Sequence, residues 1–246
     1  KIMSELVYYD LKNATKMSPS LSVQVARELG RRIVAGSFEP GALIDDENAL
    51  ADRFQVSRVV VRDAVKILVG KGMLDVRRGI GTKVRPRNEW TLLDDDVLAW
   101  HITATPNPEF INQLMDIRLA FEPKAARWAA ERATPEDVKL IEDACLQMEQ
   151  ESGSIEKFIV ADALFHQAML KAAHNEFLNA MEGVIYSALL VSVRITNKDP
   201  RKNSHSVEFH REVCNAVANG DGDEAERLTE KLLTDAIRRL KENLDS

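Results

Sequence analysis

The most constraining feature of this chain is a short segment, Ser57–Arg62, of sequence SRVVVR. Apolar residues continue behind it at helical spacing, so the segment predicts the start of a short amphipathic helix. Ser57 is suited to be the N-cap, and Arg58 and Arg62, four residues apart, project from one face of the first turns. Arginines at the N-terminal end of a helix can reach guanine edges or phosphates in a DNA major groove.

A second short helix is predicted immediately before this one, over residues 47–54, with only Gln55 and Val56 between the two. Two short helices joined by so tight a turn indicate a helix-turn-helix, whose first helix crosses the DNA backbone while the second enters the major groove.

A glycine-rich hairpin is predicted downstream of the helix-turn-helix. Residues 75–78 and 83–85 fit two short strands on either side of the tip Gly79-Ile80-Gly81-Thr82. Such a hairpin is the wing of a winged helix. Glycine lets the backbone approach a phosphate or a narrow minor groove closely.

Charge divides the chain into two parts. Residues 21–87 carry 13 Lys and Arg against 8 Asp and Glu, a net charge of +5, whereas the whole chain carries 33 against 39, a net charge of −6. The remainder therefore has a net charge of about −11. A basic module joined to an acidic one indicates a part that binds a polyanion and a body with another task.

The chain of 246 residues suits two domains, and we expect a mainly α protein. The boundaries that we predict are a flexible arm over residues 1–20, a winged helix-turn-helix over 21–88, a linker over 89–105 and an all-α antiparallel bundle over 106–246. In the last part, apolar spacing predicts a helix that starts at Asn107 and runs at least to Ala129, and further helices near 134–151, 155–173, 176–195, 204–219 and 222–243.

Cysteine usage and hydropathy limit where the protein works. Cys145 and Cys214 lie in predicted helices, so we expect buried free thiols in a reducing cytoplasm and no disulfide framework. No segment has the apolar length of a membrane span, and no signal-peptide pattern opens the chain.

Several segments resemble the GntR family of bacterial transcription regulators. In the front half these are GSFEPGAL (36–43), VSRVVVRDA (56–64) and GIGTKV (79–84). The back half resembles the effector-sensing FCD domain of the FadR subfamily, through IRLAFEPKAA (117–126), DALFH (162–166) and EFHREV (208–213). The segments at 86–90, 93–100 and 126–134 narrow the likeness to repressors of sugar-acid operons.

The resemblance implies a homodimer that binds an inverted repeat in double-stranded DNA. It implies DNA contacts from Arg58 and Arg62 of the second helix and from Gly81 of the wing. Asn48 stands where most members of the family have an arginine; it can still bond a phosphate or an adenine edge, but it brings no charge. The other candidate DNA contacts are Ser57, Arg78 and Thr82.

A cluster of potential metal ligands is predicted in the back half. Asp162 and His166 are four residues apart and emerge from one helix face, where a carboxylate and an imidazole can chelate one divalent cation. The resemblance implies His210 as a third ligand and a further histidine on the last helix, where this chain has Leu232. Zinc or nickel is therefore expected with a reduced ligand set. Alternatively, the three side chains bind the effector or buried water directly, or form a structural polar cluster.

Arg118 is the residue that we expect to bind the carboxylate of the effector (an anion hook), because a guanidinium binds a carboxylate through two parallel hydrogen bonds. The alternative for Arg118 is an ion pair with Glu122, one turn along the same helix. Arg194 lies in an apolar run and is a candidate for effector binding or for a subunit contact. Asp235 is a weaker candidate for the effector cavity.

These observations together predict a DNA-binding transcriptional regulator that is not an enzyme. We expect a repressor of a sugar-acid catabolic operon, released by a small carboxylate such as a hexonate. The alternatives are an activator of the same architecture and a metal-dependent helical enzyme with a DNA-binding appendage. The enzyme is disfavoured because no second carboxylate is placed as a general base and no nucleophile constellation is present.

Overall fold

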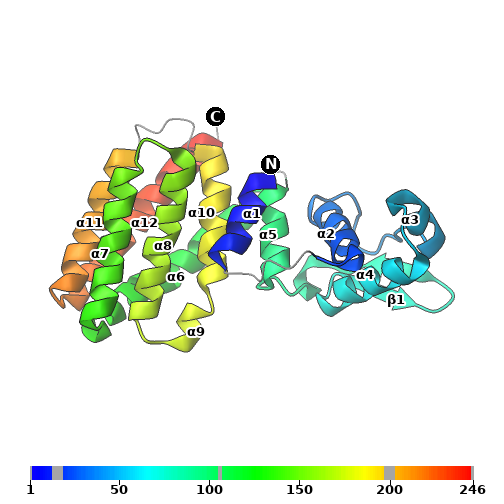
Figure 1. Cartoon of the computed structure of the whole chain (residues 1–246), viewed down its shortest axis with the longest axis horizontal. Helices are drawn as coiled ribbons and strands as arrows, with labels where there is room; N and C mark the ends of the chain where they lie inside the picture. The colour runs from blue at the N-terminus through cyan, green and yellow to red at the C-terminus, as the bar shows by residue number, and fades with distance from the viewer. Residues whose placement is uncertain (1, 13–18, 105–106, 197–202, 245–246) are drawn as a thin grey trace. The chain divides into compact units, whose positions relative to one another are not determined.

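The computed structural model of the chain describes residues 2–12, 19–104, 107–196 and 203–244, and these fold into two compact units (Figure 1). The winged-helix unit comprises residues 1–9 and 13–105, and the helical unit comprises residues 10–12 and 106–246. Within the described residues, no helix is long and apolar enough to cross a membrane.

The winged-helix unit contains the predicted helix-turn-helix. Its elements are α2 (Leu21–Val34), α3 (Glu47–Phe54), α4 (Arg58–Gly70), β1 (Leu74–Arg77), β2 (Gly81–Val84) and the short 3-10 helix η1 (Arg87–Glu89). Asp46 and Ser57 cap α3 and α4 through their side-chain oxygens. Gln55 takes a left-handed conformation with φ of 52° and ends α3, which makes the turn between the two helices this tight.

The two strands form the predicted wing. They pair antiparallel from Leu74 opposite Val84 to Arg77 opposite Gly81. Gly79 and Gly81 have φ angles of 77° and 120°, which favour glycine, and they bracket Ile80 at the exposed tip.

The core of the winged-helix unit is formed by the inner faces of α2, α3 and α4, with Trp100 packed on α2. The Trp100 ring lies so close to Gly30 that a Cβ at residue 30 would stand 2.2 Å from it. Trp100 belongs to α5 (Asp95–Thr103), whose residues 97–102 are all buried. The expectation of a linker over residues 89–105 is therefore corrected. Asp94 is the N-cap of a helix, and the apolar residues after it complete a core.

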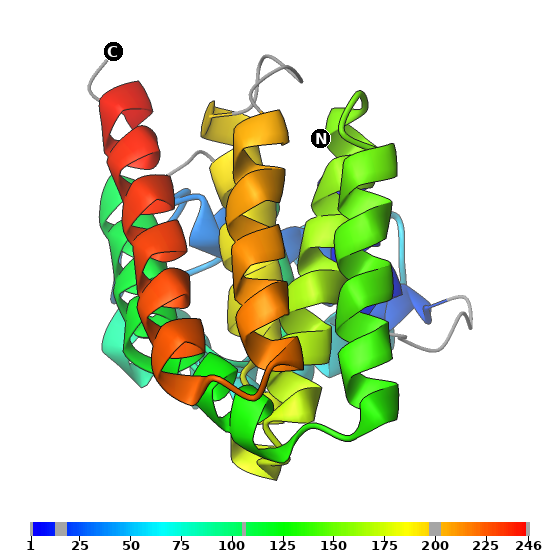
Figure 2. The same ribbon diagram turned by 90° about the vertical axis from the view of Figure 1, so that its left-hand side faces the viewer.

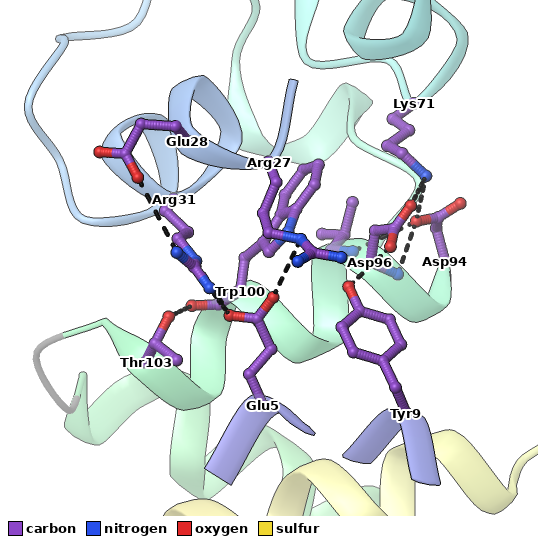
Figure 3. A network of polar contacts seen from close by, with 11 residues as sticks. Glu5, Tyr9, Arg27, Glu28, Arg31, Lys71, Asp94, Asp96, Trp100 and Thr103 are labelled. Carbon is purple, nitrogen blue, oxygen red and sulfur yellow. Dashed lines mark hydrogen bonds and ion pairs between the residues drawn. The ribbon is translucent and has the colours of Figure 1, made fainter. Parts of the chain in front are cut away.

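The expected flexible arm is also corrected over part of its length, because Ile2–Leu11 form a helix, α1. Its polar side chains hold it to the rest of the winged-helix unit (Figure 3). Glu5 is 2% exposed, accepts a hydrogen bond of 2.9 Å from Nε of Arg31, and lies 3.5 Å from Nε of Arg27. The Tyr9 hydroxyl donates to Asp96 at 2.7 Å. These contacts join residues far apart in sequence, so local spacing did not predict the helix.

The helical unit consists of α6 (Pro108–Arg132), α7 (Pro135–Gln150), α8 (Ile155–Ala172), α9 (Glu176–Asn179), α10 (Glu182–Thr196), α11 (Asn203–Ala218) and α12 (Gly222–Leu244). In Figure 2, α12, α11 and α7 stand next to one another in red, orange and green. The single helix predicted over residues 176–195 is instead two, α9 and α10. Cys145 and Cys214 are free and buried in the core of this unit.

Candidate DNA-binding surface and metal centre

Helix α4 separates a buried face from an exposed, cationic one. Val61, Ala64, Val65 and Leu68 point into the core. The side chains of Arg58 and Arg62 are 61% and 53% exposed. The Ser57 hydroxyl accepts a bond of 3.3 Å from the backbone N–H of Val60, so its role in this structure is to start the helix.

The two arginines share a carboxylate on the preceding helix. Glu47 of α3 accepts hydrogen bonds of 2.8 and 3.2 Å from Arg62, and its Oε2 lies 3.8 Å from Arg58. The hydrogen bonds and charge of Arg62, helped by the charge of Arg58, lower the pKa of Glu47 below its usual range. Glu47 thus holds both guanidinium groups near the N-terminal end of α4. Sequence reasoning missed this residue, because the contact joins two helices 15 residues apart.

The remaining candidate DNA contacts belong to the same unit. Asn48, Arg78 and Gly81 are exposed, and Thr82 is half-buried. The Thr82 carbonyl accepts a bond of 3.0 Å from the N–H of Ile44, which ties the wing to the segment before α3.

Three of the predicted metal ligands meet in the helical unit. Asp162 and His166 come from α8 and His210 comes from α11, and one ligand atom from each lies within 4.8 Å of the other two. Oδ1 of Asp162 is 3.3 Å from Nε2 of His166 and 3.1 Å from Nε2 of His210. Two ligands about 2.1 Å from one ion, at a tetrahedral or octahedral angle, are separated by about 3.0–3.4 Å.

In both imidazoles the second ring nitrogen, Nδ1, already has a hydrogen-bonding partner. Nδ1 of His166 is 2.7 Å from Oε2 of Glu122, and Nδ1 of His210 is 2.7 Å from the Ser206 carbonyl. A metal-ligating histidine usually donates its other ring N–H to a carboxylate or carbonyl in this way. Among the described residues, neither Oδ1 of Asp162 nor Nε2 of His210 has a partner in hydrogen-bond geometry. The residues therefore fit a divalent cation.

Protons compete with a cation for this cluster. Burial alone would lower the pKa of His166, but the neighbouring carboxylates of Glu122 and Asp162 outweigh it and raise that pKa to about 9. Burial likewise opposes ionisation of Asp162, yet the two histidines hold its pKa well below the usual range. Because a ligating imidazole must be neutral, a cation that bound here at pH 7 would displace a proton from His166.

Arg118 forms the ion pair that was the alternative to an anion hook. Its guanidinium is 3% exposed and is bound to Glu122 through Nε and, at 3.3 Å, through Nη2. Glu122 in turn holds His166. Sequence reasoning named Glu122 only as the partner of Arg118, because its link to His166 spans two helices. The three side chains form a buried chain that ends at the metal ligands.

A small cavity adjoins this cluster. Glu122 and His166 line one side, and Leu232 and Thr229 of α12 line another. Leu232 is therefore beside the cluster, where the resemblance implied a fourth imidazole. The space open to the centre of a water molecule is about 10 Å³, which is room for about one water. A sugar acid does not fit without movement of the surrounding side chains.

Of the other effector candidates, Asp235 does not join the cluster. Asp235 is paired with Arg238 at 2.8 Å and with Arg239 at 2.9 Å, and it borders a surface hollow beside Phe209. Arg194 belongs to α10, and its side chain lies outside the described residues.

Family models match both units. The model described as "Bacterial regulatory proteins, gntR family" matches residues 21–84, and that of the FCD domain matches residues 113–235. The chain belongs to the GntR family. It combines the GntR and FCD domains in the manner of the FadR subfamily, and it is a transcriptional regulator of this type.

Two relatives and one solved structure are similar to this chain over most of its length. The galactonate operon transcriptional repressor of Escherichia coli K12 is 34% identical over 215 residues, covering 87% of this chain and 94% of that protein. LutR of Bacillus subtilis is 33% identical, covering 78% and 88%. The structure of Lar, which controls expression of the Listeria monocytogenes agr system, has a TM-score of 0.64 at 17% identity, covering 92% and 99%, and supports the fold alone.

Proposed function

We propose that the protein is a repressor of a sugar-acid catabolic operon that leaves its operator when a small carboxylate binds the helical unit. The single observation that carries the proposal is the convergence of Asp162, His166 and His210 on one point inside the FCD domain. The relative named as a galactonate operon repressor supports a hexonate as the effector class. The relatives are named as regulators, which supports a sensor in preference to an enzyme.

Asp162, His166 and His210 would hold the cation, zinc or nickel. The bound cation would supply positive charge for the carboxylate and hydroxyl oxygens of the effector. Arg118 keeps Glu122 ionised and in place, and Glu122 orients His166 through Nδ1. Arg118 therefore acts by positioning in this proposal, because an effector carboxylate could reach it only by displacing Glu122.

The winged-helix unit supplies the DNA contacts. Two subunits would each place α4 in the major groove of one half of an inverted repeat and the wing beside it. Arg58 and Arg62 would leave Glu47 for bases or phosphates, and the wing would use Arg78, Gly81 and Thr82. Asn48 would bind a phosphate of the DNA backbone. Effector binding can weaken this complex only through a difference in effector affinity between the free and DNA-bound states.

Fluorescence anisotropy with a labelled duplex, taken from the DNA upstream of the protein's own gene, tests the proposal. Galactonate and other aldonic acids, added with Zn²⁺ or Ni²⁺, should release the labelled duplex, whereas the corresponding neutral sugars should not. Prior dialysis against a chelator should abolish the release. His210→Ala should retain DNA binding and lose the response. Tighter DNA binding on addition of the acid would identify an activator, and release by neutral sugars would exclude the carboxylate model.

A further inference from the structure

Val59, in the first turn of α4, is exposed although it belongs to the apolar series of that helix. Its side chain is 65% exposed, whereas that of Val61, two residues further, is fully buried. Among the described residues of the winged-helix unit, no large apolar side chain is more exposed. The fold of the unit therefore does not use this side chain, and leaving it in water forgoes the gain of burying it.

The neighbours of Val59 define what can cover it. Arg62 lies three residues on and is its neighbour on the helix surface, and Arg58, which precedes it, is exposed as well. A partner that covers Val59 must also satisfy two cations, which favours a polyanion over an apolar protein surface. Duplex DNA meets both requirements, because its major groove is lined by phosphates and carries one apolar group, the C5-methyl of thymine.

The chemistry of valine makes the contact selective. Valine has no donor or acceptor for a base edge, and its branched Cβ leaves one preferred rotamer in a helix. It therefore presents a fixed pair of methyl groups.

We propose that Val59 is a specificity-determining residue that packs against the C5-methyl of a thymine in each half of the operator, beside the contacts of Arg58 and Arg62. This inference rests on the proposed DNA readout by α4 and adds to it the identity of one base. It predicts that each half-site contains a thymine at a constant spacing from the base or phosphate that Arg62 contacts.

The test removes single methyl groups from the DNA. Wild-type protein would first select its site from duplexes with a randomised central region, and each thymine of the selected half-site would then be replaced by uracil. At one thymine per half-site the replacement should weaken binding about fourfold per methyl group. Val59→Ala should bind the thymine duplex with a similar loss and should not respond to uracil at that position.

Val69→Ala is the matched control, because Val69 is 40% exposed near the far end of α4. It should keep the wild-type response to uracil, and both variants should keep the wild-type melting temperature. If the wild type selects a site but no uracil weakens its binding, or if Val59→Ala responds as the wild type does, the inference is overturned while the proposed function stands. Failure of the wild type to select any duplex would overturn the proposed function itself.

Discussion

The two units place their functional groups in opposite environments. Arg58 and Arg62 of the winged-helix unit are more than half exposed, whereas His166 and His210 of the helical unit are 5% and 2% exposed. A group in water can be exchanged with little effect on folding, but a buried charge is held by partners that are left unsatisfied without it. Binding and stability should therefore be separable in the first unit and linked in the second.

The largest expected effect is on DNA binding. The double substitution Arg58→Ala with Arg62→Ala should weaken binding to a selected operator by about a hundredfold or more, because each lost arginine contact is worth about 1–3 kcal/mol. The melting temperature should stay within about one degree of the wild type, since both side chains are exposed. Anisotropy and thermal unfolding measure the two quantities.

Lys66→Ala is the control for loss of charge, since Lys66 is an exposed cation two turns further along α4. It should weaken binding much less. If Lys66→Ala lost half as much binding free energy as the double variant, which removes two charges, α4 would contribute only its charge and would not read bases by its N-terminal end.

The helical unit should respond in the opposite way. Glu122→Ala should destabilise it by about 3–5 kcal/mol, because Arg118 and His166 lose the carboxylate that compensates their buried charges. Urea unfolding followed by far-ultraviolet circular dichroism measures the change.

A paired replacement distinguishes this cause from simple loss of packing. Arg118→Met combined with Glu122→Leu removes both charges at similar volume, so it should destabilise the unit less than Glu122→Ala alone. A double variant that is less stable than the single one would show that the ion pair itself stabilises the fold.

One buried group in the winged-helix unit should link folding to pH. Burial lowers the pKa of His101 from 6.5 to about 4. The unfolded chain therefore binds a proton that the folded chain resists between pH 6.5 and 4. The stability that goes with a neutral, buried His101 is fully present above pH 6.5. About 3 kcal/mol of the free energy of unfolding is lost as the pH falls from 6.5 to 4. Urea titrations at pH 7.5 and 4.5, followed by tryptophan fluorescence, should show a smaller difference for His101→Asn than for the wild type.

The smallest expected effect is a gain. Leu232 lines the cavity beside His166, so Leu232→His would add an imidazole near the three existing ligands. Zinc affinity measured by calorimetry should rise by at least about tenfold. Lys231→His, which changes an exposed neighbour, should leave the affinity unchanged. No gain in the Leu232 variant would place the cation away from the cavity.

Local spacing was enough to predict the helix-turn-helix. The arginines of α4, the cap at Ser57 and the glycines of the wing act within a few residues, and the structure contains the predicted helices and hairpin. Periodicity also predicted most helices of the second unit. It missed the break between α9 and α10, where no proline and no glycine separates Asn179 from Glu182.

Contacts between distant residues account for what sequence reasoning missed. Trp100 fell within the predicted linker over residues 89–105, but its packing partner could not be named, because its ring lies against Gly30, 70 residues earlier. Glu5 forms ion pairs with side chains of α2, and Glu122 reaches His166 across two helices. Periodicity within one segment cannot reveal such pairs. For Asp235, the nearby arginines of α12 were the overlooked signal.

The size of the cavity beside His166 has a kinetic consequence. A ligand larger than water must wait for α12 side chains such as Leu232 to move aside, so opening precedes entry. At high ligand concentration the observed association rate should then level off at the rate of opening instead of rising in proportion. Above that concentration, the speed of induction in the cell would be set by the motion of the side chains that line the cavity and would no longer rise with the supply of metabolite.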